Sequence, residues 1–337
     1  MFKMMQLASK RRFTPGFGFA LLLLLAAVAG VLFPDPFTQK KWGESGQWVT
    51  VATFVIFVFI GRSISLDVLA KEMKRPMVTM TIQGSIFLVT WGLANLLYRN
   101  NVSASPFLVG FLVVLVLPST ISSCIVYART AGGNTEFALG HSFLSNLIAP
   151  FLFPLFCGMW LYGVGYTGVS FASVVEKVYP RLGLLILLPL ILGYLSPKIP
   201  LAGVKRDWEK KAPLVCILFL SYVAFASGSS LGLLDQSINQ WLKLIVWTVV
   251  CWLVLSFLGW ISGKVVGLNT SERISAYFVV SQKSLATGIP LIFAVMGTRT
   301  VEGWIWIILP LTFYHLFQLI AGAGVVAYLN RKANEDR

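Results

Sequence analysis

One lysine stands in the middle of an apolar stretch of this sequence. Lys283 lies in the polar run 281–287, inside the apolar stretch 274–296. An ammonium near the centre of a membrane helix costs roughly 2.5–3.5 kcal/mol on insertion scales, so it is rarely placed there without a partner or a task. Gly288 and Pro290 follow at positions where a membrane helix could break and free its carbonyls around a polar cavity. This pattern predicts a multi-spanning transporter whose working site lies inside the bilayer.

A second polar cluster lies in the first half of the chain. The run 117–124 reads Leu-Pro-Ser-Thr-Ile-Ser-Ser-Cys, and Pro118, which has no backbone N–H, favours a kink or a break there. Hydroxyls of this kind can also bond back to their own helix and simply bend it. In the next apolar stretch, Ser142 and Asn146 are four residues apart and share a helix face, where they could serve a site or hold two helices together. The candidate substrate- or ion-binding residues are Gln83, Ser122, Ser123, Cys124, Ser142, Asn146, Ser281, Gln282, Lys283, Thr287 and His315.

The sequence offers no acidic partner at the depth of Lys283. Glu136 stands at the start of a predicted span, near Arg129 in the sequence. Lys283 is about 15 Å from the start of its span at 1.5 Å per residue, which is too deep for its ammonium to reach the membrane surface easily. We therefore expect hydroxyls, amides, carbonyls or an anionic substrate to hold the side chain, unless the amine is neutral.

The composition is that of a membrane protein. The 337 residues are 57% hydrophobic and 12% charged, and the apolar residues come in blocks of the length that crosses a bilayer. A net charge of +14 would suggest nucleic acid for a soluble chain, but here the lysines and arginines fit loops that face the cytoplasm and anionic lipid. The four cysteines lie in apolar stretches without metal-ligand spacing. We expect the lipid bilayer as a partner and no nucleic acid.

Ten membrane spans are predicted, and they divide into five plus five. The basic loops alternate, and the positive-inside rule then places both termini in the cytoplasm. An odd number of spans in each half gives the halves opposite orientations, as in transporters built from inverted repeats. The first repeat is expected at 1–165 and the second at 178–330. The predicted spans are roughly 16–33, 47–66, 77–98, 106–127, 136–163, 179–197, 213–234, 241–267, 273–296 and 303–329.

Three stretches of the sequence resemble a known family. They are Leu117 to Pro150 with its Pro-Ser-Thr-Ile-Ser-Ser run, Ser281 to Ala286, and Leu309 to Gln318. Together they resemble the bile acid:sodium symporter superfamily, and within it the SBF-like branch that is similar to sodium/bile acid cotransporter 7. The resemblance implies an all-α polytopic protein of a bacterial inner membrane, with ten helices in two inverted five-helix repeats. Helices 1, 2, 6 and 7 would form a panel domain, and helices 3–5 and 8–10 a core domain in which broken helices 4 and 9 cross. It also implies alternating-access transport of organic anions.

The same resemblance carries over part of the family's sodium-binding set. Gln83 and Gln282 match its glutamines, and Ser123 and Ser142 match two of its hydroxyls. These four residues would form at most a weakened sodium site.

Other members of the set are replaced in this sequence. The family's asparagine in the fourth span falls on Cys124, and a hydroxyl of the fifth span falls on Ala138. The glutamate that serves both sodium sites falls on Phe278, and an asparagine of the sodium-coupled members falls on Lys283. Sodium needs several hard oxygen ligands, and a fixed cation nearby opposes its binding.

These replacements suggest that the Lys283 ammonium occupies the place of the bound ion and neutralises the broken-helix dipoles. The chain would then carry a small organic anion without sodium, either as a uniporter or coupled to a proton if Lys283 titrates. The alternatives are a sodium-coupled organic anion or bile acid symporter with a reduced site, and a non-transporting membrane regulator. An enzyme is not expected, because no Ser–Lys or Asp–Asp pair is convincingly arranged for catalysis. No cofactor is expected, and sodium is doubted.

Overall fold

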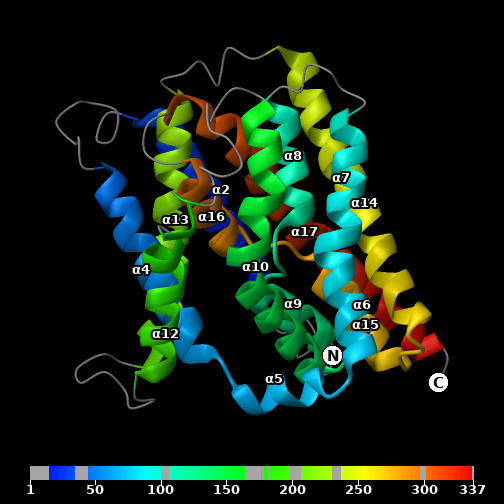
Figure 1. The fold of residues 1–337 in the computed structure, drawn as a ribbon. Helices are drawn as coiled ribbons and strands as arrows, with labels where there is room; N and C mark the ends of the chain where they lie inside the picture. The colour runs from blue at the N-terminus through cyan, green and yellow to red at the C-terminus, as the bar shows by residue number, and fades with distance from the viewer. Residues whose placement is uncertain are drawn as a thin grey trace, which may run out of the picture.

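The computed structural model describes residues 15–34, 45–99, 106–163, 176, 178–180, 182–196, 206–229, 237–296 and 301–335. Within these ranges the chain is helical and contains no β-strand (Figure 1). This agrees with the predicted all-α class. The expected boundary between the two halves, 165–178, falls almost entirely outside the described residues, as do 1–14 and 336–337 at the two ends.

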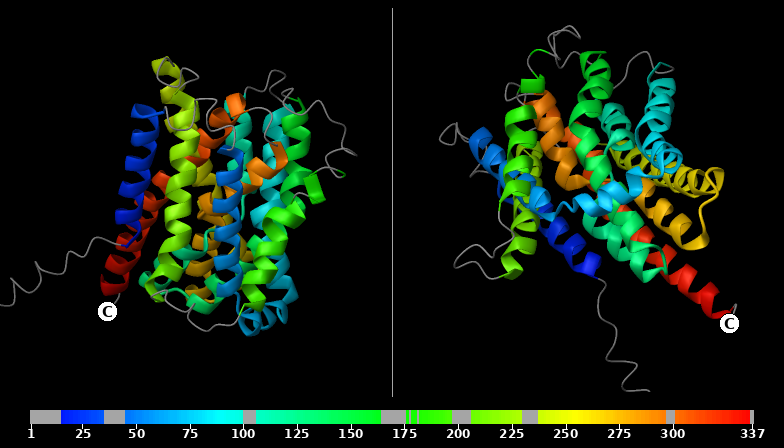
Figure 2. Two further views of the ribbon diagram at one scale, coloured as in Figure 1. Left: turned by 90° about the vertical axis from the view of Figure 1, so that its left-hand side faces the viewer. Right: turned by 60° about the horizontal axis from the view of Figure 1, so that its bottom comes forward.

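One group of helices packs together on the left of Figure 1 and faces the viewer in the left view of Figure 2. In this group α13 contacts α2 and α4, and α12 contacts α4. These helices come from the predicted spans one, two, six and seven. Their bounds are α2 (Pro15–Leu32), α4 (Ser45–Ser63), the π-helical turn η3 (Gly183–Leu187) with α12 (Leu188–Leu195), and α13 (Arg206–Ser229).

The other helices form a second, larger group. A short helix, α5 (Leu66–Met73), runs along the lower end of the molecule in Figure 1 and leads from α4 into this group. It follows α4 at a bend of 71°. The further members are α6 (Pro76–Gly84), the π-helical turn η2 (Ser85–Val89), α7 (Thr90–Arg99), α8 (Pro106–Val116), α9 (Ile121–Thr130), α10 (Thr135–Gly163), α14 (Ile238–Val265), α15 (Thr270–Ser281), α16 (Leu285–Met296) and α17 (Val301–Glu335).

The helices are those of a polytopic membrane protein. Among the described residues, five helices are long and apolar enough to cross a membrane alone, or six if the bent pair α4–α5 is one span. Four shorter apolar helices accompany them. A count of ten spans in two inverted repeats, and the panel and core division, stay predictions. The helix α13 begins at Arg206, and its apolar part, Lys211–Ala226, lies where the seventh span was predicted to start.

Two predicted spans are broken, and one break lies where the sequence indicated. The helix α8 ends at Val116 and α9 starts at Ile121, so the gap contains Pro118. The second break was expected around Gly288 and Pro290, and this was wrong: α15 ends at Ser281, α16 starts at Leu285, and the gap contains Lys283 itself. Pro290 lies inside α16, where it removes one backbone hydrogen bond but does not end the helix.

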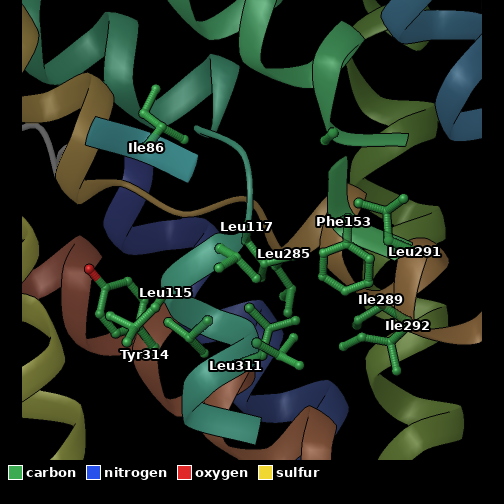
Figure 3. Close-up of a cluster of buried hydrophobic side chains, with 14 of the residues drawn as sticks. Ile86, Leu115, Leu117, Phe153, Leu285, Ile289, Leu291, Ile292, Leu311 and Tyr314 are labelled. Carbon is green, nitrogen blue, oxygen red and sulfur yellow. The ribbon is translucent and has the colours of Figure 1, made fainter. Parts of the chain in front are cut away.

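The interior around the breaks is filled by aliphatic side chains. Figure 3 shows Leu117, Leu285 and Leu311 within this cluster. Gly288 lies against it, because a Cβ at this position would come within 2.8 Å of the Leu311 side chain and 2.9 Å of that of Leu117. A tightly packed apolar layer therefore surrounds the two breaks and leaves the broken segments little room to shift.

The helices α4 and α12 approach each other closely because each presents a glycine. A Cβ at Gly193 would collide with the Val58 carbonyl, and a Cβ at Gly61 with the Leu190 carbonyl. Small residues of this kind let two membrane helices pack backbone to backbone.

We expect Gly193→Ala to lower the free energy of unfolding by about 1–3 kcal/mol, because the added methyl group must push the two backbones apart. Gly183→Ala is the matched control, since nothing lies within 4 Å of a Cβ there. Thermal unfolding of the detergent-purified protein measures both. Equal midpoints for the two variants would contradict the close packing of α4 on α12.

Candidate functional site: two broken helices that cross

The two breaks meet each other in the interior of the protein. The extended segments 117–120 and 282–284 run antiparallel, and Ser119 lies opposite Lys283. The Thr120 N–H donates to the Gln282 carbonyl at 2.8 Å, and the Ser284 N–H donates to the Pro118 carbonyl at 2.9 Å. A broken helix frees backbone groups that cannot be left unpaired away from water. Here each break supplies partners for the other.

The Lys283 side chain is fully buried at this crossing. Its Nζ donates to the Leu117 carbonyl at 2.9 Å and to the Ile86 carbonyl at 3.3 Å. Leu117 follows the last residue of α8, so Nζ of Lys283 lies at the negative end of that helix dipole. Ile86 belongs to the π-helical turn η2. Among the described residues, backbone carbonyls hold the Lys283 side chain.

The backbone of Lys283 is held by a side chain from α17. Its N–H donates to Gln318 Oε1 at 2.6 Å, and its carbonyl accepts from Gln318 Nε2 at 2.8 Å. Gln318 Nε2 also lies 2.7 Å from Nδ1 of His315. The sequence placed His315 among the candidates but left out Gln318, although the two are three apart on one helix face.

The Asn146 amide and the Thr287 hydroxyl connect the first half of the chain to the second. Asn146 Nδ2 donates to the Ser119 carbonyl at 2.8 Å, and its Oδ1 accepts from the Thr287 hydroxyl at 2.6 Å. The Ser142 hydroxyl lies 3.2 Å from that of Ser119. Cys124 is buried against the hydroxyls of Ser142 and Ser119. The structure thus brings Ser142, Asn146, Thr287 and Cys124 to the crossing.

Gln282 joins the two broken helices beside Lys283. Its Oε1 accepts from the Ser123 hydroxyl at 3.2 Å, and its Nε2 donates to the Gln318 carbonyl at 3.1 Å. Ser281 is buried too, but its carbonyl is the group in use, accepting from Tyr314 at 2.7 Å.

Gln83 lies in a different polar cluster. Its Nε2 donates to the His141 carbonyl at 3.0 Å. The ring of His141 in turn approaches a carboxylate, because its Nε2 lies 3.5 Å from Oε2 of buried Glu72. Glu72 was not predicted to take this role, because it stands in a short connection between two predicted spans. Similarly, Glu136 pairs with Lys71 of α5 at 2.5 Å. This contact was not predicted, because Glu136 lies near Arg129 in the sequence.

A cavity of about 190 Å³ opens beside the crossing. Hydroxyls near the start of α9 form part of its wall, and so do the first two residues of α16. Apolar residues of α2 and α13 also line it. Among the candidates, Ser122, Ser123 and His315 line this cavity. The other lining residues are Phe19, Thr120, Val126, Tyr127, Leu214, Ile217, Leu285, Ala286 and Leu319.

The sequence matches the SBF-like CPA transporter family over residues 18–331. It is similar to YfeH of Escherichia coli K12, named as a candidate symporter, with 27% identity over 327 residues, which are 94% of this chain and 94% of the relative. It is also similar to sodium/bile acid cotransporter 7-B of Xenopus laevis, with 24% identity over 329 residues, 91% of this chain and 90% of the relative.

We expect Asn146→Ala to destabilise the protein by about 1–3 kcal/mol, because the Ser119 carbonyl and the Thr287 hydroxyl both lose a buried partner. The control is Thr130→Ala at the end of α9, where an exposed hydroxyl bonds only to its own helix. Thermal unfolding in detergent compares the two variants. An unchanged midpoint for Asn146→Ala would show that this bridge between the halves does not matter for stability.

Proposed function

This chain belongs to the SBF-like CPA transporter family, and from that premise we propose that it is a secondary carrier for a small organic anion, working by alternating access without sodium. Its apolar helices and its transporter relatives make it an integral membrane protein. A bacterial inner membrane with both termini in the cytoplasm is the location that we propose. The observation that carries the mechanism is the buried ammonium of Lys283 at the crossing of two broken helices.

The Lys283 ammonium takes the part of a bound cation. A cation at a crossing of this kind is held by carbonyl oxygens and by the negative ends of half-helices. Lys283 Nζ uses such ligands, namely the carbonyls of Leu117 at the end of α8 and of Ile86 in η2. The charge is fixed covalently to α15–α16, so it neither enters nor leaves with the substrate.

The residues that would hold sodium support this proposal. Phe278, at the position of the family's carboxylate, is buried against the ring of Tyr127 at a centroid distance of 5.7 Å. Ala138 is buried and offers no ligand. Gln83 is bonded to His141, while Gln282 is bonded to Ser123 and the Gln318 carbonyl. Gln83 is therefore engaged in a different cluster from Gln282 and Ser123, which bond to each other, and Ser142 contacts Ser119.

The cavity suits an amphipathic anion. Helix N-termini present unpaired backbone N–H groups, which bind anions. The helix α9 starts at the cavity wall, and its N-cap residue Thr120 makes no side-chain capping bond. The first residues of α16 lie at the same cavity. Phe19, Leu214 and Ile217, which also line it, offer apolar surface for a hydrocarbon body.

We expect uptake of a suitable carboxylate or sulfonate into proteoliposomes to be equal in sodium and in choline buffer. Lys283→Met should reduce this uptake at least tenfold, because the carbonyls of Leu117 and Ile86 lose their cation. Lys264→Met, at an exposed lysine near the end of α14, is the control for loss of one positive charge.

Three outcomes separate the alternatives. Uptake that requires sodium would favour a symporter with a reduced sodium site. Undiminished uptake in Lys283→Met would reject the role of this lysine. If no anion in a broad screen shifts the melting temperature or is taken up, the chain is a non-transporting membrane protein.

We further expect Ile217→Trp to reduce uptake about tenfold or more, because the larger ring fills part of a cavity of about 190 Å³. Ile245→Trp on the exposed face of α14 is the matched control. Initial uptake rates and binding by thermal shift measure the effect. Normal binding in Ile217→Trp would place the substrate elsewhere.

A further inference from the structure

Gln318 does more than fill space in α17. Lys283 and Ser119 face each other in the antiparallel crossing, but the hydrogen bonds between the segments come from the neighbouring residues, Thr120 to Gln282 and Ser284 to Pro118. In such a pair the N–H and C=O of the central residue point away from the partner segment. Those groups of Lys283 would be unpaired in the interior, and the Gln318 side chain binds both of them.

This double contact fixes the orientation of the Gln318 amide. A backbone N–H can only donate, so the atom 2.6 Å from the Lys283 nitrogen must be the amide oxygen. The amide nitrogen is then the atom 2.8 Å from the Lys283 carbonyl. Its second hydrogen is available for Nδ1 of His315, 2.7 Å away.

The amide in turn selects one form of the His315 ring. Nδ1 must accept from Gln318, because two hydrogens cannot share a contact of 2.7 Å. The competing contact, from Nδ1 to the Lys283 carbonyl, is longer at 3.3 Å. An accepting Nδ1 belongs to the neutral ring with its hydrogen on Nε2. His315 lines the cavity, is 6% exposed and meets Phe19 of α2 edge-on with the ring centroids 6.3 Å apart.

We infer that His315 is a substrate-binding residue that donates its Nε2–H to the anionic group of the substrate, and that Gln318 is the positioning residue that sets this donor. The inference rests on the proposed function for the identity of the substrate. The Gln318 side chain thus connects His315, the substrate donor, to the backbone of Lys283. Among the lining residues of the cavity there is no lysine or arginine, so His315 and the hydroxyls are the side-chain donors that an anion meets there.

The ring state can be tested without any transport. The chain has two histidines, so protein labelled with ¹⁵N-histidine gives signals from two rings. His315→Gln removes one set and assigns the other to His141. In the wild-type protein we expect hydrogen on Nε2 of His315. In Gln318→Met nothing donates to Nδ1, and we expect the hydrogen to move to Nδ1, where the Lys283 carbonyl can accept it.

A wild-type ring with its hydrogen on Nδ1 overturns the inference, whatever the protein transports. The same holds if Gln318→Met folds and leaves the tautomer unchanged. If that variant does not fold, the wild-type spectrum alone decides. A correct ring state in a protein that moves no anion supports the assignment of Gln318 but rejects the proposed function, so the two failures are distinct.

Transport kinetics test the second half of the inference. His315→Leu should raise KM about tenfold to a hundredfold with kcat little changed, as for the loss of a hydrogen bond to a charged group. His315→Gln, which keeps a donor, should stay nearer the wild type. Gln318→Met should raise KM in the wild-type background but add little in the His315→Leu background. Effects of the two substitutions that simply multiply would show that Gln318 does not act through His315.

Discussion

The central interaction of this structure is a buried lysine side chain whose Nζ donates to backbone carbonyl oxygens. Burying a charge is costly unless it is paired or well hydrogen-bonded. Lys283 meets this requirement through the carbonyls of Leu117 and Ile86. Both carbonyls lie at irregular backbone, one beyond the end of α8 and one in the π-helical turn η2. A continuous helix uses its own carbonyls, so the irregular segments are what make this site possible.

The two breaks also depend on each other. Segment 117–120 cannot be extended at this depth unless segment 282–284 supplies its hydrogen bonds, and the reverse is equally true. Ser145 and Asn146 of α10 bind the N–H and the carbonyl of Ser119, and Gln318 of α17 binds both backbone groups of Lys283. The helices that resume after the two breaks, α9 and α16, both start beside the cavity. Under the proposed function, the crossing that holds Lys283 would therefore also place two helix N-termini near the anion.

Much of this arrangement could be predicted from the sequence, and the rest depends on contacts between distant residues. Apolar blocks of bilayer length gave the helices within a few residues, and Pro118 gave the first break. The second break was misplaced because Gly288 and Pro290 are compatible with a helix locally, whereas the pairing of Lys283 with Ser119 is visible only in three dimensions. Gln318 and Glu72 were missed for the same reason: their partners lie on other helices.

A tethered cation has a consequence for energetics that a sodium ion does not have. Sodium that enters and leaves with the substrate ties transport to its gradient, whereas Lys283 stays with the protein throughout the cycle. Under the proposed function, the lysine lowers the electrostatic cost of the anion in both inward- and outward-facing states. An interaction that favours both states equally does not shift the equilibrium between them. It can therefore speed equilibration of the anion but cannot drive accumulation. Net uphill transport would require coupling to another gradient, such as that of a proton that leaves and rejoins the protein in each cycle.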